Sequence, residues 1–117
     1  MTARLALVVL IAGLFIGGAQ PVAVGLIPAP WDKLTHCAVF ALLAVLIGLA
    51  GNLDQTQRAA WLWLAFFGAL AIGAADELHQ ATLPGRQAGW GDLAADALGA
   101  ALGVTLLHHW LKNVRRR

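Results

Sequence analysis

The sequence DELHQATLPGRQAGWGDLAAD, residues 76–96, lies between two long apolar stretches and ends inside the second of them. It contains four of the six carboxylates of the protein, together with one histidine, one arginine and a Leu-Pro-Gly turn. Proline and glycine interrupt helices and favour turns, so this stretch predicts a connection between two helices with acidic residues near both helix ends. We therefore expect any functional site to lie around this connection.

The composition of the chain is that of a membrane protein. Of its 117 residues, 60% are hydrophobic and 12% are charged, whereas soluble domains carry about 25% charged residues. Backbone groups inside a bilayer must be hydrogen-bonded within each segment, so long apolar runs indicate helices. The single cysteine, Cys37, excludes an internal disulfide and, inside an apolar run, favours a packing role. The sequence therefore predicts an all-α integral membrane bundle.

Four apolar runs predict four transmembrane helices, at about residues 5–20, 34–51, 59–76 and 93–110, in a single domain of residues 1–117. The run 34–51 would extend about 27 Å at a rise of 1.5 Å per residue, close to the ~30 Å hydrocarbon core of a bilayer. The first run follows Arg4 and is followed by small residues, a pattern also found in cleaved signal peptides. We interpret it as a membrane span. The proline-rich segment 20–31 predicts a loop.

The charges divide between the two ends of such a bundle. Four spans place both termini on one side, and the basic C-terminal tail with Arg4 predicts that this side is cytoplasmic. That side would also hold Arg58, Lys112 and a single acid, Asp54. The outer side would hold two basic and five acidic residues. Because the basic residues gather where topology requires them, the net charge of +2 does not indicate nucleic-acid binding.

Helical spacing brings polar side chains of three spans to the outer end. Residues three or four apart share a helix face, which pairs Asp32 with His36 and Asp92 with Asp96. Ionisable groups at this depth usually face the bundle interior, so we predict an outward-facing polar pocket. Its candidate residues are Asp32, Lys33, His36, Asp76, Glu77, His79, Gln80, Arg86, Asp92 and Asp96. The alternative, an ion-pair network that only fastens the outer loops to the bundle, stays open.

Two contacts are specific enough to check. Arg86 should lie within salt-bridge distance of Asp76, Glu77 or Asp92, because a guanidinium is the natural partner for a carboxylate near a membrane. Asp96 lies one helical turn deeper than the start of its span. It should therefore face the bundle interior, near His36 or Lys33.

The patterns of known catalytic and metal sites are largely missing. No His-Glu-x-x-His spacing occurs, so we predict no metal site and no cofactor, although His36, His79 and the carboxylates together leave a metal site open. The chain contains no serine, which disfavours a serine nucleophile. Acid–base catalysis by Asp76, Glu77 or His79 is compatible with the spacing. Whether the protein is an enzyme therefore stays open.

Two blocks of residues resemble the VanZ-like family, small helical membrane proteins named for a factor associated with teicoplanin resistance. The first block is Asp32-Lys33-Leu34-Thr35-His36, followed by Phe40. The second is Asp76-Glu77-Leu78-His79-Gln80, followed by Pro84-Gly85-Arg86, Asp92 and Gly99. The chain departs from the family pattern at Thr82, where that pattern favours an aromatic residue, and at Asp96, where it favours an asparagine. The pattern also favours a serine near Gly89.

The resemblance implies a multi-pass protein of the bacterial inner (cytoplasmic) membrane. It further implies that the pocket binds or modulates a lipid-linked or peptidoglycan-related envelope component and so lowers glycopeptide susceptibility. The expected partners are membrane lipid, such a lipid-linked ligand and another membrane protein, and no nucleic acid. Two other classes stay open: an intramembrane enzyme that acts on a lipid through a carboxylate–histidine cluster, and a structural accessory subunit of a larger membrane complex.

Overall fold

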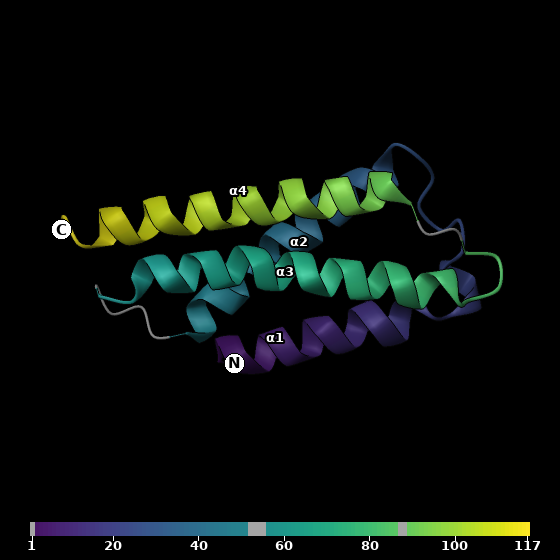
Figure 1. Ribbon diagram of the computed structural model, residues 1–117, viewed down its shortest axis with the longest axis horizontal. Coiled ribbons are helices and arrows are strands. Elements are labelled where there is room, and N and C mark those ends of the chain that lie inside the picture. Colours follow the sequence, from purple (N-terminus) through teal and green to yellow (C-terminus); the bar gives the residue numbers. More distant parts are fainter. Residues whose placement is uncertain (1, 52–55, 87–88) are drawn as a thin grey trace.

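The computed structural model describes residues 2–51, 56–86 and 89–117, and all regular structure in these ranges is helical. The elements are α1 (Ala3–Ala12), the π-helical segment η1 (Gly13–Gly17), the 3-10 turn η2 (Pro21–Ala23), α2 (Trp31–Ala50), α3 (Arg58–Ala81) and α4 (Trp90–Val114). The helices run along the longest dimension of a bundle measuring 49 × 25 × 20 Å. The C-terminus lies at one end of it, and the N-terminus lies in the same half but further in (Figure 1). The predicted all-α fold is confirmed.

Three helices, α2, α3 and α4, are long and apolar enough to cross a membrane, and α1 with η1 forms a fourth, shorter apolar helix. The long helices extend beyond the apolar runs that predicted them. Helix α3 continues past residue 76 to Ala81, and α4 begins at Trp90 rather than at residue 93. Glutamate and glutamine are good helix formers, so Glu77 and Gln80 prolong α3 although they are polar. The chain is therefore a multi-pass membrane protein.

The turn predicted after α3 is confirmed. Gly85 has a φ of +75°, a backbone conformation that residues with a side chain rarely adopt. The chain turns here before it reaches α4. The polar connection expected before Arg58, including Asp54, lies mostly outside the described residues.

Helices α2 and α4 approach each other most closely. A Cβ atom added to Gly99 would lie 2.2 Å from the backbone oxygen of Cys37, and one added to Gly103 would lie 2.2 Å from that of Ala41. Glycines commonly allow such close helix packing in membrane proteins. The core beside this contact is formed by buried residues of three helices, Phe40, Leu43, Ala44, Ala69 and Ala100. The close approach brings the first two turns of α4 against the polar start of α2.

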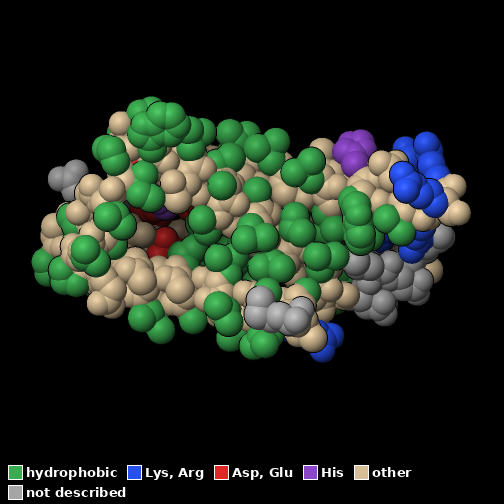
Figure 2. Space-filling model, turned by 180° about the vertical axis from the view of Figure 1, so that it is seen from behind, with side chains coloured by type: hydrophobic (Ala, Val, Ile, Leu, Met, Phe, Trp, Pro, Cys, Tyr) green, Lys and Arg blue, Asp and Glu red, His purple; other side chains and the backbone are tan. Residues whose placement is uncertain are grey.

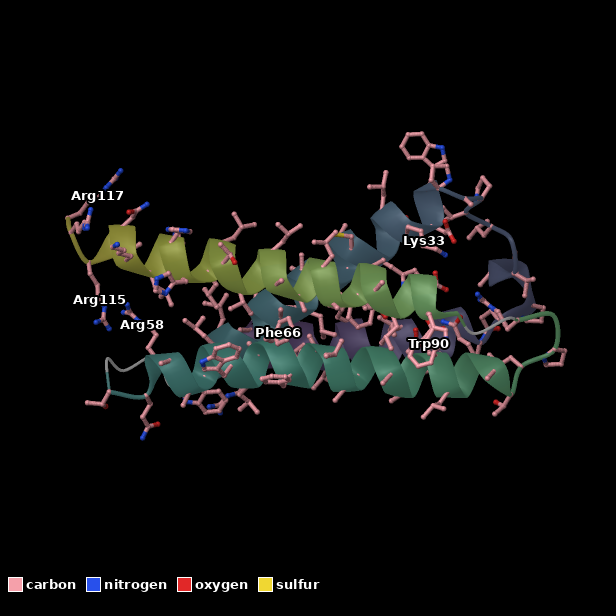
Figure 3. The ribbon with its side chains drawn as sticks, turned by 45° about the horizontal axis from the view of Figure 1, so that its top comes forward. Lys33, Arg58, Phe66, Trp90, Arg115 and Arg117 are labelled. Atoms are coloured by element: carbon pink, nitrogen blue, oxygen red, sulfur yellow. The ribbon has the colours of Figure 1, made fainter. Side chains whose placement is uncertain are left out.

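The side surface of the bundle is mainly hydrophobic, and the charged residues gather at its ends (Figure 2). Figure 3 shows Arg58, Arg115 and Arg117 at the end where the chain terminates, with Lys33 and Trp90 toward the other. Large apolar side chains are exposed along every long helix, as expected for helices that face lipid tails. The separation of the basic end from the acidic end agrees with the sequence expectation.

Candidate functional site

The centre of the site is a hydrogen bond between α2 and α4. The Nδ1 atom of His36 lies 2.7 Å from Oδ1 of Asp96, and Asp96 is fully buried. The expectation that Asp96 faces the interior near His36 is thus confirmed. Phe40, one turn further along α2, stacks parallel to the imidazole with ring centroids 6.3 Å apart and holds its orientation.

Gly73 of α3 makes room for this pair. A Cβ atom at Gly73 would lie 2.8 Å from Oδ2 of Asp96 and 3.1 Å from the ring of Phe40. A larger residue would therefore push the carboxylate away from α3. Sequence reasoning missed this role, although Gly73 lies three residues before Asp76 and so on the same helix face, which was a usable signal.

Lys33 joins the starts of α2 and α4 at the edge of the site. Its Nζ atom lies 2.8 Å from Oδ2 of Asp32 and also bonds Oδ1 of Asp92. The Nε2 atom of His36 lies 4.0 Å from the other oxygen of Asp92. The Lys33 side chain is 44% exposed, so this network lies at the accessible edge of the site.

Helix α3 supplies three buried polar residues. Asp76, Glu77 and Gln80 are between 2% and 8% exposed. Gln80 donates from Nε2 to Oδ2 of Asp76 at 2.9 Å, and the backbone N–H of Gly89 donates to Oε2 of Glu77 at 3.1 Å. One oxygen of each buried carboxylate has no hydrogen-bond partner among the described residues: Asp76 Oδ1, Glu77 Oε1 and Asp96 Oδ2.

The prediction for Arg86 is wrong. Its Nη2 atom donates to the backbone oxygen of Gly18 at 2.6 Å. The salt bridges of the described residues around the site join Lys33 and His36 to carboxylates and do not include Arg86. Carbonyls at a helix end lack partners within the helix, so the one at Gly18 is a natural acceptor. Arg86 thereby ties the loop after α3 to the end of the first helix, and its buried Nε has no partner.

His79 does not join the other candidates. Its ring packs against Phe15 of η1, with centroids 5.6 Å apart, and its backbone oxygen accepts a bond from the hydroxyl of Thr82. His79 therefore fastens the end of α3 to the first helix and takes no part in the hydrogen bonds of the buried carboxylates described above.

A cavity of about 660 Å³ opens beside the cluster, within the roughly 300–1,000 Å³ typical of ligand pockets. Its apolar wall comes from α1 and the following loop and includes Val9, Leu10 and Val24. Its polar end is formed by six candidates, Asp32, His36, Asp76, Gln80, Arg86 and Asp92. Figure 2 shows acidic atoms deep in a hollow of the hydrophobic surface, at the end opposite the basic cluster. The sequence did not predict the apolar wall, because aliphatic residues are common along every span.

Three candidates from three different helices have the geometry to hold a metal ion. One ligand atom from each of His36, Glu77 and Asp96 lies within 4.8 Å of the other two. Sequence reasoning looked for two ligands on one helix and predicted no metal. Packing of α2, α3 and α4 instead gathers single ligands from each helix.

Comparison with protein-family models found a match. The model of the family described as VanZ/LLP1 matches residues 5–112. Searches of curated proteins and of solved structures gave no match.

Proposed function

We propose a function from the premise that this chain belongs to the VanZ/LLP1 family, whose model reaches from α1 to α4. The protein binds a lipid-linked component of the bacterial envelope in the cavity beside α1, and this binding lowers susceptibility to glycopeptide antibiotics. The observation that carries the proposal is the division of the cavity into an apolar wall and a polar end. A membrane lipid has the same division, between its hydrocarbon tail and its headgroup.

The polar end favours a headgroup that both accepts and donates hydrogen bonds. The buried Nε of Arg86 is a charged donor without a partner, and Oδ1 of Asp76 is a buried acceptor without one. Buried polar groups gain most from a ligand that completes their hydrogen bonds. A phosphate would accept from Arg86, and sugar hydroxyls or peptide amides would donate to Asp76. Phosphate-linked saccharides and peptides carry both kinds of group.

The charge distribution supports an outward-facing pocket in the cytoplasmic membrane. Basic residues favour the cytoplasmic side of membrane proteins, so the end with Arg58 and the C-terminal arginines would be cytoplasmic, together with both termini. The cavity would then open toward the outer leaflet.

Lipid retention by the purified protein tests the proposal. Wild type extracted into mild detergent should carry a bound lipid with a phosphate headgroup, identified by native mass spectrometry. Asp76→Asn and Arg86→Gln should each reduce retention at least about tenfold, the effect of losing one charge-assisted hydrogen bond of roughly 1.5 kcal/mol. Thr105→Val is the control, because the Thr105 hydroxyl donates within its own helix, to the backbone oxygen of Ala101, and does not line this cavity. Equal retention by wild type and Asp76→Asn would refute the proposal, as would unchanged teicoplanin susceptibility after deletion of the gene.

The hydrogen bond of the half-buried His36 to the buried Asp96 favours a second candidate, an intramembrane enzyme acting on the same lipid. Asp96 orients the imidazole, and His36 lines the cavity, so His36 is placed to act as a general base on water. Incubation of the protein with extracted envelope lipids should then release a headgroup fragment. His36→Gln should abolish that release, and because His36 also lines the polar end of the cavity, lipid retention by the variant is measured alongside. An unchanged lipid mass spectrum with wild type would exclude this candidate.

A further inference from the structure

The interior of the bundle gathers metal-ligand groups from three helices. His36 comes from α2, Glu77 from α3 and Asp96 from α4, and their ligand atoms lie within 4.8 Å of one another. Around a zinc ion with bonds of about 2.0–2.2 Å, neighbouring ligand atoms lie roughly 3–3.5 Å apart. Metal binding would draw the three ligand atoms to that spacing. We propose that these three residues bind a divalent metal ion with affinity for both nitrogen and oxygen, Zn²⁺ or Mn²⁺.

The buried oxygens without partners are an independent reason for this proposal. Asp96 is fully buried and Glu77 is 7% exposed, and each has a carboxylate oxygen with no hydrogen-bond partner among the described residues. The other oxygen of each residue is already bonded, to His36 and to the Gly89 N–H respectively. Unpartnered buried carboxylate oxygens are costly, and coordination of a metal ion is one of the few ways to satisfy them.

The excess of buried carboxylates over basic side chains also supports a bound cation. Asp76, Glu77 and Asp96 are all buried, and His36 is the one basic side chain that bonds to any of them within the part of the chain that the structure describes. Lys33 is engaged by two other carboxylates at the edge of the site. Buried charges in membrane proteins are normally paired or coordinate an ion. A divalent cation supplies the missing positive charge at the place where the acids meet.

The donor set selects the class of metal. Imidazole nitrogen suits zinc and related transition ions, and carboxylates suit manganese as well. Calcium and magnesium prefer sites made of oxygen alone. His36 also lines the cavity, which gives the ion a path into the bundle. The inference is independent of lipid binding, because the three ligands come from the protein itself.

Calorimetric titration of the chelator-treated protein in detergent tests the site. Wild type should bind one equivalent of Zn²⁺ or Mn²⁺ per chain, and that ion should raise the melting temperature. His36→Gln, Glu77→Gln and Asp96→Asn should each weaken binding at least about tenfold. The matched control is His109→Gln, which removes an exposed histidine at the other end of α4 and should leave the affinity unchanged.

Three results would overturn the proposal: no binding of either ion by wild type, loss of binding in His109→Gln, or binding of Ca²⁺ and Mg²⁺ alone with no response to His36→Gln. A second measurement needs no variant and so does not depend on variants that fold. Diethyl pyrocarbonate modifies histidines, and mass spectrometry locates the modified residues. Bound metal should protect His36 in the wild type. Equal modification of His36 with and without metal would count against the site.

Discussion

Replacement of Gly99 by alanine should separate α2 from α4 and break the central hydrogen bond of the site. The new Cβ would lie 2.2 Å from the backbone oxygen of Cys37. Carbon and oxygen atoms approach to about 3.3 Å even in weak hydrogen bonds. Because the obstacle is backbone rather than a flexible side chain, α4 must move away from α2 by roughly 1 Å.

That movement acts directly on the site, since Asp96 lies one turn before Gly99 on the same helix. The His36–Asp96 bond of 2.7 Å would lengthen to about 3.7 Å, beyond the ~3.2 Å limit of a good hydrogen bond. Overpacking costs typically about 1–3 kcal/mol, and a lost hydrogen bond to a charged group costs about 1.5–3 kcal/mol. We therefore expect Gly99→Ala to lower the free energy of unfolding by about 2.5–6 kcal/mol.

The assay is reversible unfolding in mixed micelles, followed by circular dichroism. Gly68→Ala is the matched control, because the added Cβ there would lie 3.6 Å from Ile47 Cδ1, an ordinary contact. In the control, helix propensity alone should stabilise by up to about 1 kcal/mol. Gly99→Ala should thus lower the free energy of unfolding, and Gly68→Ala should raise it. If the Gly99→Ala variant were as stable as the wild type or more stable, the close approach of α2 and α4 would be refuted.

Three further outcomes are expected. Leu10→Trp should fill the cavity from α1 and reduce lipid retention at least about tenfold, whereas Val8→Trp, on an exposed position outside the cavity, should not; equal retention would show that the lipid lies elsewhere. Lys33→Met should lower the free energy of unfolding by less than about 1 kcal/mol, because the ion pairs of Lys33 are partly exposed. High salt should remove this difference between the variant and the wild type. In a cysteine-free background, a cysteine at Gly89 should react with an impermeant thiol reagent from outside the cell and one at Gln57 should not; the reverse pattern would invert the topology.

Helix number and type were predictable because the lipid environment imposes a simple pattern. Apolar runs of membrane length have to be helical, and four runs gave four helices. The boundaries were less accurate, because an apolar run marks the part of a helix suited to lipid rather than the whole helix. Glu77 and Gln80 are polar, yet they continue α3 for more than a turn beyond residue 76.

Contacts in the site were predictable where the spacing of residues along one helix decides them. They were not predictable where the partner is a backbone group. The spacing between Asp92 and Asp96 placed Asp96 deeper in its helix, and the His36 contact followed. Arg86 instead donates to the backbone carbonyl of Gly18. Every residue has such a carbonyl, so residue types do not indicate which one a side chain will bond. The grouping of His36 and Glu77 with Asp96 depends on the packing of three helices, which no spacing along one helix encodes.

The first helix has a consequence for how the proposed specificity is encoded. Neither α1 nor η1 contains a buried residue, and none of the candidate polar residues belongs to them. With the loop that follows them they give the cavity most of its apolar wall, while α2, α3, α4 and the loop with Arg86 carry the polar side chains. Separate segments of the chain would then determine the preference for tail length and the preference for headgroup. A chimera that exchanges only residues 3–27 between family members should transfer the preference for the tail and keep that for the headgroup, so the two preferences can diverge independently.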